Sequence, residues 1–175
     1  MGLHVVAHAG EACGPESVRQ AVEALGAERI GHGLAAARDP AVLALLRDRR
    51  IPLEVCLSSN VATGVLARIE DHPLLQFLDA GLMVTLNTDD PAMFSTDLTR
   101  EYVLAARTFD LSREQILHLG QNAIRAAFLP EEEKVRLLST MAFPDHGEFR
   151  VNACGDEYAD ACELRRKGER GDERG

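Results

Sequence analysis

Short apolar segments alternate with amphipathic segments along most of the chain, at intervals of about 25 to 30 residues. The apolar segments are residues 3–7, 29–33, 51–57 and 82–86. This spacing is typical of strand–helix–strand units, in which right-handed crossovers join parallel strands. The sequence therefore predicts an α/β fold with a parallel sheet and four strand–helix units.

The segments between and after these strands have apolar residues three and four positions apart, the pattern of amphipathic helices. Helices are expected at residues 16–25, from Pro40 to residue 46, and at 72–79, 98–108, 112–128 and 130–140. Pro40 suits a first helical turn, and Gly81 suits the position just after a helix end. Ser112 and Glu114 are well placed to cap and charge a helix start.

The apolar periodicity stops near residue 145, and the last residues carry charges of both signs with several glycines. A segment of this composition buries too little apolar surface to order itself. We therefore expect residues 1–144 to form the folded part and residues 145–175 a charged, disordered tail.

The net charge restricts the ligands of this chain. With 28 acidic and 19 basic residues, the formal charge of −9 gives no basic surface for a nucleic acid backbone, so a small-molecule ligand is expected. No apolar run approaches the roughly 20 residues that span a bilayer, and the first residues lack a secretion signal. These features predict a cytoplasmic protein that binds neither nucleic acid nor membranes.

The chain has four cysteines and no Cys-x-x-Cys pair. Cys56 falls inside an apolar segment, where a thiol packs as a small hydrophobic side chain. We interpret all of them as free thiols: Cys13, Cys56, Cys154 and Cys162.

Polar residues follow each expected strand. In parallel α/β folds, ligands bind at the carboxyl ends of the strands, so these residues are expected to share one rim. Histidine and carboxylate side chains there could hold a divalent metal and exchange protons beside it. The candidates are His8, Glu11, His32, Asp89 and Asp90.

Each candidate has an ordinary structural explanation when taken alone. A single histidine at a strand end is more often a packed residue, and Asp89-Asp90-Pro91 is more often a turn or helix cap. Two adjacent carboxylates repel each other, however, and a cation near Asp89 would relieve that repulsion. A desolvated Glu11 could hold a proton near neutral pH and donate it. Their joint occurrence favours a metal-dependent acid–base site.

Four segments in order then resemble a known family. Residues 8–11 (His-Ala-Gly-Glu), 29–33 (Arg-Ile-Gly-His-Gly), 54–60 and 86–91 (Leu-Asn-Thr-Asp-Asp-Pro) are similar to successive signatures of the adenosine deaminase family of the amidohydrolase superfamily. The resemblance runs from about residue 3 to residue 138, with Leu57 where the family often has proline. It implies the C-terminal half of a TIM (β/α)8 barrel, strands five to eight with the following helices.

The resemblance also implies a role for each candidate. His8 and Asp89 match zinc ligands of the family, and His32 matches the histidine that orients and deprotonates the attacking water. Glu11 matches the glutamate that donates a proton to a ring nitrogen of the purine. The implied reaction is zinc-dependent hydrolytic deamination of adenosine or a related adenine-type purine.

Two further candidates are assigned to the substrate. Asp90 matches an aspartate that hydrogen-bonds purine N7, and Gly10 is expected to contribute to substrate binding. Residues 93–95, which follow the aspartate pair, are expected to line the site. The sequence leaves adenosine, adenine and a modified nucleoside such as aminodeoxyfutalosine open as substrates.

The family's His-x-His motif, which supplies two more zinc ligands, does not occur in this chain. His4 and His8 would lie about 13 Å apart on one strand, too far to share a zinc ion. His72 and His118 are expected to be surface or packing histidines, and His146 lies near the tail. Two ligands alone predict weak zinc binding.

Because the fold needs eight strands and the sequence offers four, we expect a fragment that is little active alone. The alternative is a non-catalytic remnant or subunit that needs a partner chain, either a second copy or the missing N-terminal half. A doubly wound nucleotide-binding domain is disfavoured, because no Gly-x-Gly-x-x-Gly motif follows the first strand.

Overall fold

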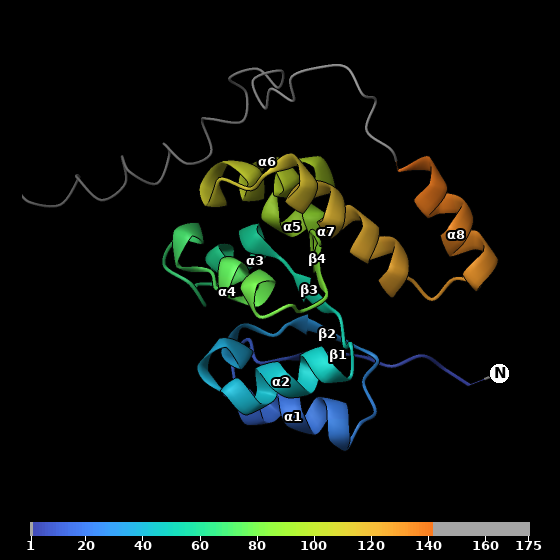
Figure 1. Cartoon of the computed structure of the whole chain (residues 1–175). Coiled ribbons are helices and arrows are strands. Elements are labelled where there is room, and N and C mark those ends of the chain that lie inside the picture. The colour runs from blue at the N-terminus through green and yellow to red at the C-terminus, as the bar shows by residue number, and fades with distance from the viewer. Residues whose placement is uncertain (1, 142–175) are drawn as a thin grey trace, which may run out of the picture. The chain divides into compact units, whose positions relative to one another are not determined.

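The structure, a computed structural model, describes residues 2–141 and contains one parallel sheet with the strand order β1-β2-β3-β4 (Figure 1). The strands are β1 (Val6–Ala9), β2 (Arg29–His32), β3 (Leu53–Val55) and β4 (Val84–Leu86). Within the described residues, β1 and β4 each pair with one neighbour. The α/β prediction with four parallel strands is therefore confirmed.

Helices follow every strand, as the alternation predicts (Figure 1). The α-helices are α1 (Pro15–Glu23), α2 (Pro40–Asp48), α3 (Leu57–Ala62), α4 (Leu74–Asp79), α5 (Pro91–Phe94), α6 (Leu98–Phe109), α7 (Arg113–Ala126) and α8 (Glu131–Thr140). Two short 3₁₀ helices are η1 (Leu34–Arg38) and η2 (Ile69–Asp71). Helix α1 packs beside β1 and β2, while α6 and α7 pack against β4.

Local sequence signals define several helix ends as expected. Pro40 begins α2, and the Asp39 side chain caps it by accepting hydrogen bonds from two backbone N–H groups. Ser112 caps α7 in a capping box whose second member is Gln115. Gly81 follows the end of α4 with a φ of 73°, a conformation that glycine adopts without strain.

All four strands are shorter than or displaced from the predicted segments, and the first and third differ most. The first strand covers Val6–Ala9 rather than residues 3–7, because its ladder pairs Val6 with Arg29 and Ala9 with His32. Leu3 is apolar but lies outside this ladder and is 97% exposed. The third strand ends at Val55 rather than at residue 57, because the chain turns there into the unexpected helix α3.

The core lies between the sheet and its helices. The largest fully buried apolar side chains come from three strands and five helices and include Val18, Ile30, Val42, Leu46, Leu53, Leu74, Phe77 and Leu86. Cys56 is a buried free thiol, as expected, and burial raises its pKa to about 12. Cys13 is also free, and it is exposed.

Several predictions concern residues outside those described, namely the tail at 145–175, Cys154, Cys162 and His146. Among the helices of residues 2–141, none combines the length and apolar character needed to cross a bilayer.

Helix α3 is held from a distance by a buried carboxylate on α6. Glu101 is fully buried, and its Oε2 accepts a hydrogen bond of 3.2 Å from the backbone N–H of Ser58, in the first turn of α3. Its Oε1 accepts one of 2.7 Å from the Thr96 hydroxyl. A negative charge at a helix N-terminus is favourable, so Glu101 fixes the start of α3.

Replacing Glu101 with alanine leaves the N–H of Ser58 and the hydroxyl of Thr96 without their buried acceptor. We expect Glu101→Ala to lower the free energy of unfolding by about 1–3 kcal/mol, measured by urea titration. The exposed Glu70→Ala is the control and should change it by no more than about 0.5 kcal/mol. Equal effects of the two substitutions would contradict this role for Glu101.

His72 is a packing histidine, as expected, whereas His118 is exposed at the surface. The His72 ring is 4% exposed and meets Phe77 edge-on, and neither of its nitrogens has a hydrogen-bond partner among residues 2–141. Burial lowers its pKa from 6.5 to about 3.

The folded state therefore holds His72 neutral, while the unfolded chain protonates it below pH 6.5. The stability that this residue contributes is fully present above pH 6.5 and is lost as the pH falls toward 3. The loss approaches about 1.4 kcal/mol per pH unit. Urea titrations across this window should give a flatter pH dependence for His72→Phe than for the exposed control His118→Phe; identical slopes would contradict the prediction.

Candidate functional site

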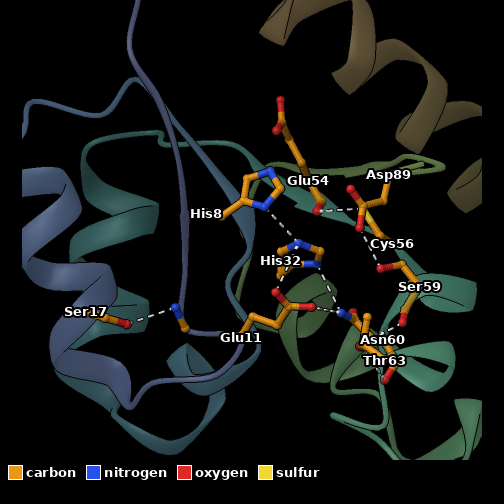
Figure 2. Close-up of polar contacts among 11 residues, drawn as sticks. His8, Glu11, Ser17, His32, Glu54, Cys56, Ser59, Asn60, Thr63 and Asp89 are labelled. Atoms are coloured by element: carbon orange, nitrogen blue, oxygen red, sulfur yellow. Dashed lines mark hydrogen bonds and ion pairs between the residues drawn. The ribbon is translucent and has the colours of Figure 1, made fainter. Parts of the chain in front are cut away.

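Four of the expected site residues converge at the carboxyl end of the sheet (Figure 2). His8 lies in β1, Glu11 follows β1, His32 ends β2 and Asp89 follows β4. Parallel strands bring these ends to one rim, as the sequence predicts. The structure thus places the imidazoles and carboxylates within reach of one another.

Two of these residues have a backbone conformation that is unusual for a side chain with a Cβ. His32 has a φ of 64° and Asp89 a φ of 57°, both in the left-handed region. Such strain persists only where the surrounding structure holds it, and it concentrates at functional sites. Both residues lie where the chain leaves a strand. Their left-handed backbone conformation directs the side chains over the carboxyl ends of the strands.

The His8 ring occupies space that a missing side chain leaves open. His8 lies opposite Gly31 in the β1–β2 ladder. A Cβ on Gly31 would stand 2.6 Å from His8 Cδ2 and 3.1 Å from His8 Nε2. The sequence analysis gave Gly31 no role of its own, although a glycine inside a strand often marks such a close approach.

His32 links the other candidates. Its Nε2 lies 3.3 Å from His8 Nδ1 and 3.6 Å from Glu11 Oε2. The ring is 1% exposed, and burial lowers the pKa of His32 against the opposing effect of the Glu11 charge. A neutral imidazole has a nitrogen lone pair, so His32 is suited to accept a proton or to bind a metal.

Helix α3 supplies two supporting residues that are not among the candidates predicted from the sequence. The Ser59 hydroxyl donates a 2.7 Å hydrogen bond to Asp89 Oδ2. The Asn60 amide lies 3.0 Å from His32 Nδ1 and donates to Glu11 Oε1 over 3.4 Å. Both side chains are fully buried. The only signal in the sequence was the polar Ser-Ser-Asn run after the third strand.

Three side chains form a candidate metal site. One donor atom from each of His8, His32 and Asp89 lies within 4.8 Å of the other two. Two imidazole nitrogens and a carboxylate oxygen are donors that zinc takes, and catalytic zinc sites use three protein ligands. The three residues would therefore fit a zinc ion, and His32, expected as a base, would lie within reach of an ion held by His8 and Asp89.

The two expected substrate residues have structural roles in this chain. Asp90 caps α5, because its Oδ1 accepts a 2.9 Å hydrogen bond from the Met93 N–H. Gly10 has a φ of 68°, donates its N–H to the Ser17 hydroxyl and accepts from the Ala35 N–H. Substrate binding by either residue stays a prediction.

His4 lies apart from this cluster. It precedes β1, contacts Glu28 over 3.0 Å and stacks on Phe128 with ring centroids 4.0 Å apart. Hydrogen bonds from His4 and from the Val5 N–H lower the pKa of Glu28. Among the described residues, the candidate metal group contains His8 but not His4, in agreement with the spacing argument.

Comparison with known sequences agrees with this geometry. Residues 1–143 match the sequence profile of the family described as adenosine deaminase. The chain belongs to the adenosine deaminase family. It is 50% identical over 141 residues to an adenosine deaminase of Klebsiella pneumoniae subsp. pneumoniae, covering 81% of this chain and 42% of that protein. It is 49% identical over 136 residues to an aminodeoxyfutalosine deaminase of Streptomyces avermitilis, covering 78% and 38%.

Solved structures of family members have the same fold. The crystal structure of an adenine deaminase from Arthrobacter aurescens superposes with a TM-score of 0.77 at 34% identity, covering 80% of this chain and 43% of that one. The expected part of a TIM barrel is thereby confirmed. The chain spans about 42% of the length of the adenosine deaminase that it matches.

Gly31 offers a test of the metal group. Gly31→Ala places a methyl group against the His8 ring and must displace it, so we expect zinc affinity to fall by about 10- to 100-fold. Competition with a chromophoric chelator measures this affinity on the purified chain. Gly14→Ala is the control, since nothing lies within 4 Å of a Cβ there. Unchanged zinc binding in Gly31→Ala would contradict the placement of His8.

Proposed function

We propose that this site, once completed by further metal ligands, catalyses the hydrolytic deamination of an adenine-type purine. The observation that carries the proposal is the convergence of His8, Glu11, His32 and Asp89 in a chain of the adenosine deaminase family. The roles below follow from these distances together with the chemistry of each side chain.

We propose that His8 and Asp89 hold a zinc ion, with His32 beside it. When bound, zinc supplies a positive charge that makes water acidic enough to lose a proton near neutral pH. The Ser59 hydroxyl orients the Asp89 carboxylate by donating to Oδ2, which leaves Oδ1 for other contacts. Since each ligand must be deprotonated, the lowered pKa of His32 also favours a neutral ring here.

The proton transfers fall to His32 and Glu11. His32 accepts the proton of the attacking water at Nε2, the nitrogen that faces His8 and Glu11. Glu11, whose side chain is 25% exposed, donates a proton to a ring nitrogen of the purine while water adds to the carbon that bears the amine. His32 then returns its proton to the amine, the carbon–nitrogen bond breaks and ammonia leaves, while the added hydroxyl gives its proton back to the Glu11 carboxylate and a ring carbonyl remains. Asp90 is proposed to contact the purine with the carboxylate oxygen that does not cap α5.

The substrate class is an adenine ring with its exocyclic amine. Relatives of this chain include deaminases of adenosine, aminodeoxyfutalosine and adenine, which share that ring and differ in what it carries. We propose that Met93, which is 72% exposed and follows the capping Asp90 closely in the chain, contacts the part that differs. Measuring the deamination rate of adenosine, aminodeoxyfutalosine and adenine side by side would show which of them is the substrate.

A second candidate is a subunit that is active only with a partner chain. One observation favours it: β1 and β4 each have one neighbour among the described residues. The two proposed ligands, His8 and Asp89, are also fewer than the three protein ligands that catalytic zinc sites use. Unpaired strand edges bind other strands readily, so a complementary half could complete both the sheet and the ligand set.

The proposed function can be tested by adding the complementary half of the barrel to this chain. We expect the purified chain, mixed with zinc and with the part of the Klebsiella adenosine deaminase that it does not match, to deaminate adenosine. Loss of the adenine absorbance band follows the reaction, and native mass spectrometry records the complex. The chain without the added half should show little activity.

Variants separate the proposed roles. Glu11→Gln keeps the size of the side chain but removes the proton donor, so the complex should form and bind zinc while the rate falls by about 100- to 10,000-fold. Glu132→Gln, on the exposed start of α8, is the matched control and should leave the rate unchanged. A stable, zinc-loaded complex that deaminates none of the three substrates would overturn the proposal.

A further inference from the structure

A cavity of about 570 Å³ lies at the amino end of the sheet, the end opposite the candidate metal site. The end of α2, the residues just before β4 and one face of α7 form it. Its lining residues are Arg47, Arg50, Gly81, Leu82, Met83, His118, Asn122 and Arg125. We call it the amino-end cavity.

The charge of the amino-end cavity is opposite to that of the whole protein. The chain has a formal charge of −9, yet the described residues that line this cavity include three arginines, one histidine and neither aspartate nor glutamate. Positive side chains gathered around a concave surface reinforce one another's field and attract anions. The cavity is therefore suited to an anionic ligand.

Arg125 is held in place without losing its charge. Its terminal nitrogens donate to Asn122 Oδ1 over 3.4 Å and to Gln121 Oε1 over 3.3 Å, both neutral amides. Asn122 is buried, and its Nδ2 donates to the Val84 carbonyl of β4 over 3.1 Å. A buried amide thus ties this guanidinium to the sheet, and no carboxylate of residues 2–141 forms an ion pair with it.

Arg50 occupies a position where glycine is usual. It follows the end of α2 with a φ of 54°, and the next N–H, that of Ile51, bonds the Leu46 carbonyl over 2.9 Å, the pattern of a helix end with a left-handed residue. Gly81 holds the equivalent position after α4.

A residue with a Cβ is strained in this conformation. Within residues 2–141, the Arg50 side chain makes no hydrogen bond or ion pair that would offset the strain. Arg47, by contrast, already lies 2.9 Å from Asp48 Oδ1. The donors of Arg50 are therefore available to a ligand in the cavity.

The donors of the amino-end cavity suit a phosphate group. A guanidinium presents a planar fork of N–H donors that matches two phosphate oxygens at once. Arg50 and Arg125 also line a neighbouring cavity of about 750 Å³, whose other residues include Phe128 and Leu129. That space would accommodate an organic group joined to the phosphate.

We propose that the amino-end cavity binds a phosphate group, either inorganic phosphate or the phosphate of a monoester, through Arg50 and Arg125. His118 and Arg47 add donors at its edge. This inference does not rest on the proposed deaminase function, because the two sites lie at opposite ends of the sheet and share no residue.

The experiment is isothermal titration calorimetry of the purified 175-residue chain. Zinc is left out, because it would bind phosphate itself. One titration uses inorganic phosphate and another ribose 5-phosphate, which has no purine ring for the deaminase site. We expect saturable binding with a Kd of about 1 mM or tighter. Tighter binding of ribose 5-phosphate would identify a monoester as the ligand, and equal binding would identify free phosphate.

Variants assign the binding to the two arginines. Arg50→Gly removes the guanidinium together with the backbone strain, so phosphate affinity should fall by about 10-fold or more while the urea midpoint of unfolding does not fall. Arg125→Gln should weaken binding by a similar factor. Arg38→Gln is the matched control, because it makes the same change in charge at an exposed arginine of η1, outside the cavity.

Two outcomes would overturn the proposal. The first is the absence of saturable binding of both compounds to the wild-type chain. The second is a loss of affinity in Arg38→Gln as large as in Arg50→Gly, since this would reflect net charge rather than a site. If Arg125→Gln does not fold, Arg50→Gly decides alone, because glycine suits the backbone at that position.

Discussion

The parallel register between β1 and β2 is the constraint on which the site depends. It sets His8 opposite Gly31 and Ala9 opposite His32, so that one imidazole lies across a residue without a side chain and the other turns over the strand end. A slip of one residue would move every side chain of β1 to the other face of the sheet. His8 would then point away from His32, and the candidate metal group would not exist.

Helix α3 is the second anchor, although it is only six residues long. Glu101 holds its start, Ser59 reaches Asp89 and Asn60 reaches His32 and Glu11. Helix α3 thus connects four segments that are distant from it in the sequence. Because Ser59, Asn60 and Glu101 are fully buried, breaking one of these hydrogen bonds leaves a buried polar group unpaired, and the cost extends to the other side chains that α3 holds in place.

Much of this arrangement could be predicted because it follows local rules. The strand–helix alternation predicts the parallel sheet that the structure has. The polar residues at the strand ends predict that His8, Glu11, His32 and Asp89 are neighbours, as they are. The differences between the prediction and the structure come from tertiary contacts. The apolar residues 3–5 looked like strand, yet only pairing with β2 decides where β1 begins. Helix α3 carries no periodic pattern and depends on Glu101, 43 residues further along the chain.

The central claim is that His8, His32 and Asp89 surround one metal position beside Glu11. Anomalous diffraction at the zinc absorption edge, from crystals of the chain grown with zinc, tests it most directly. The account predicts a peak about 2.0–2.3 Å from a His8 nitrogen and an Asp89 oxygen. A peak elsewhere, such as between His4 and Glu28, with none at His8, would contradict it.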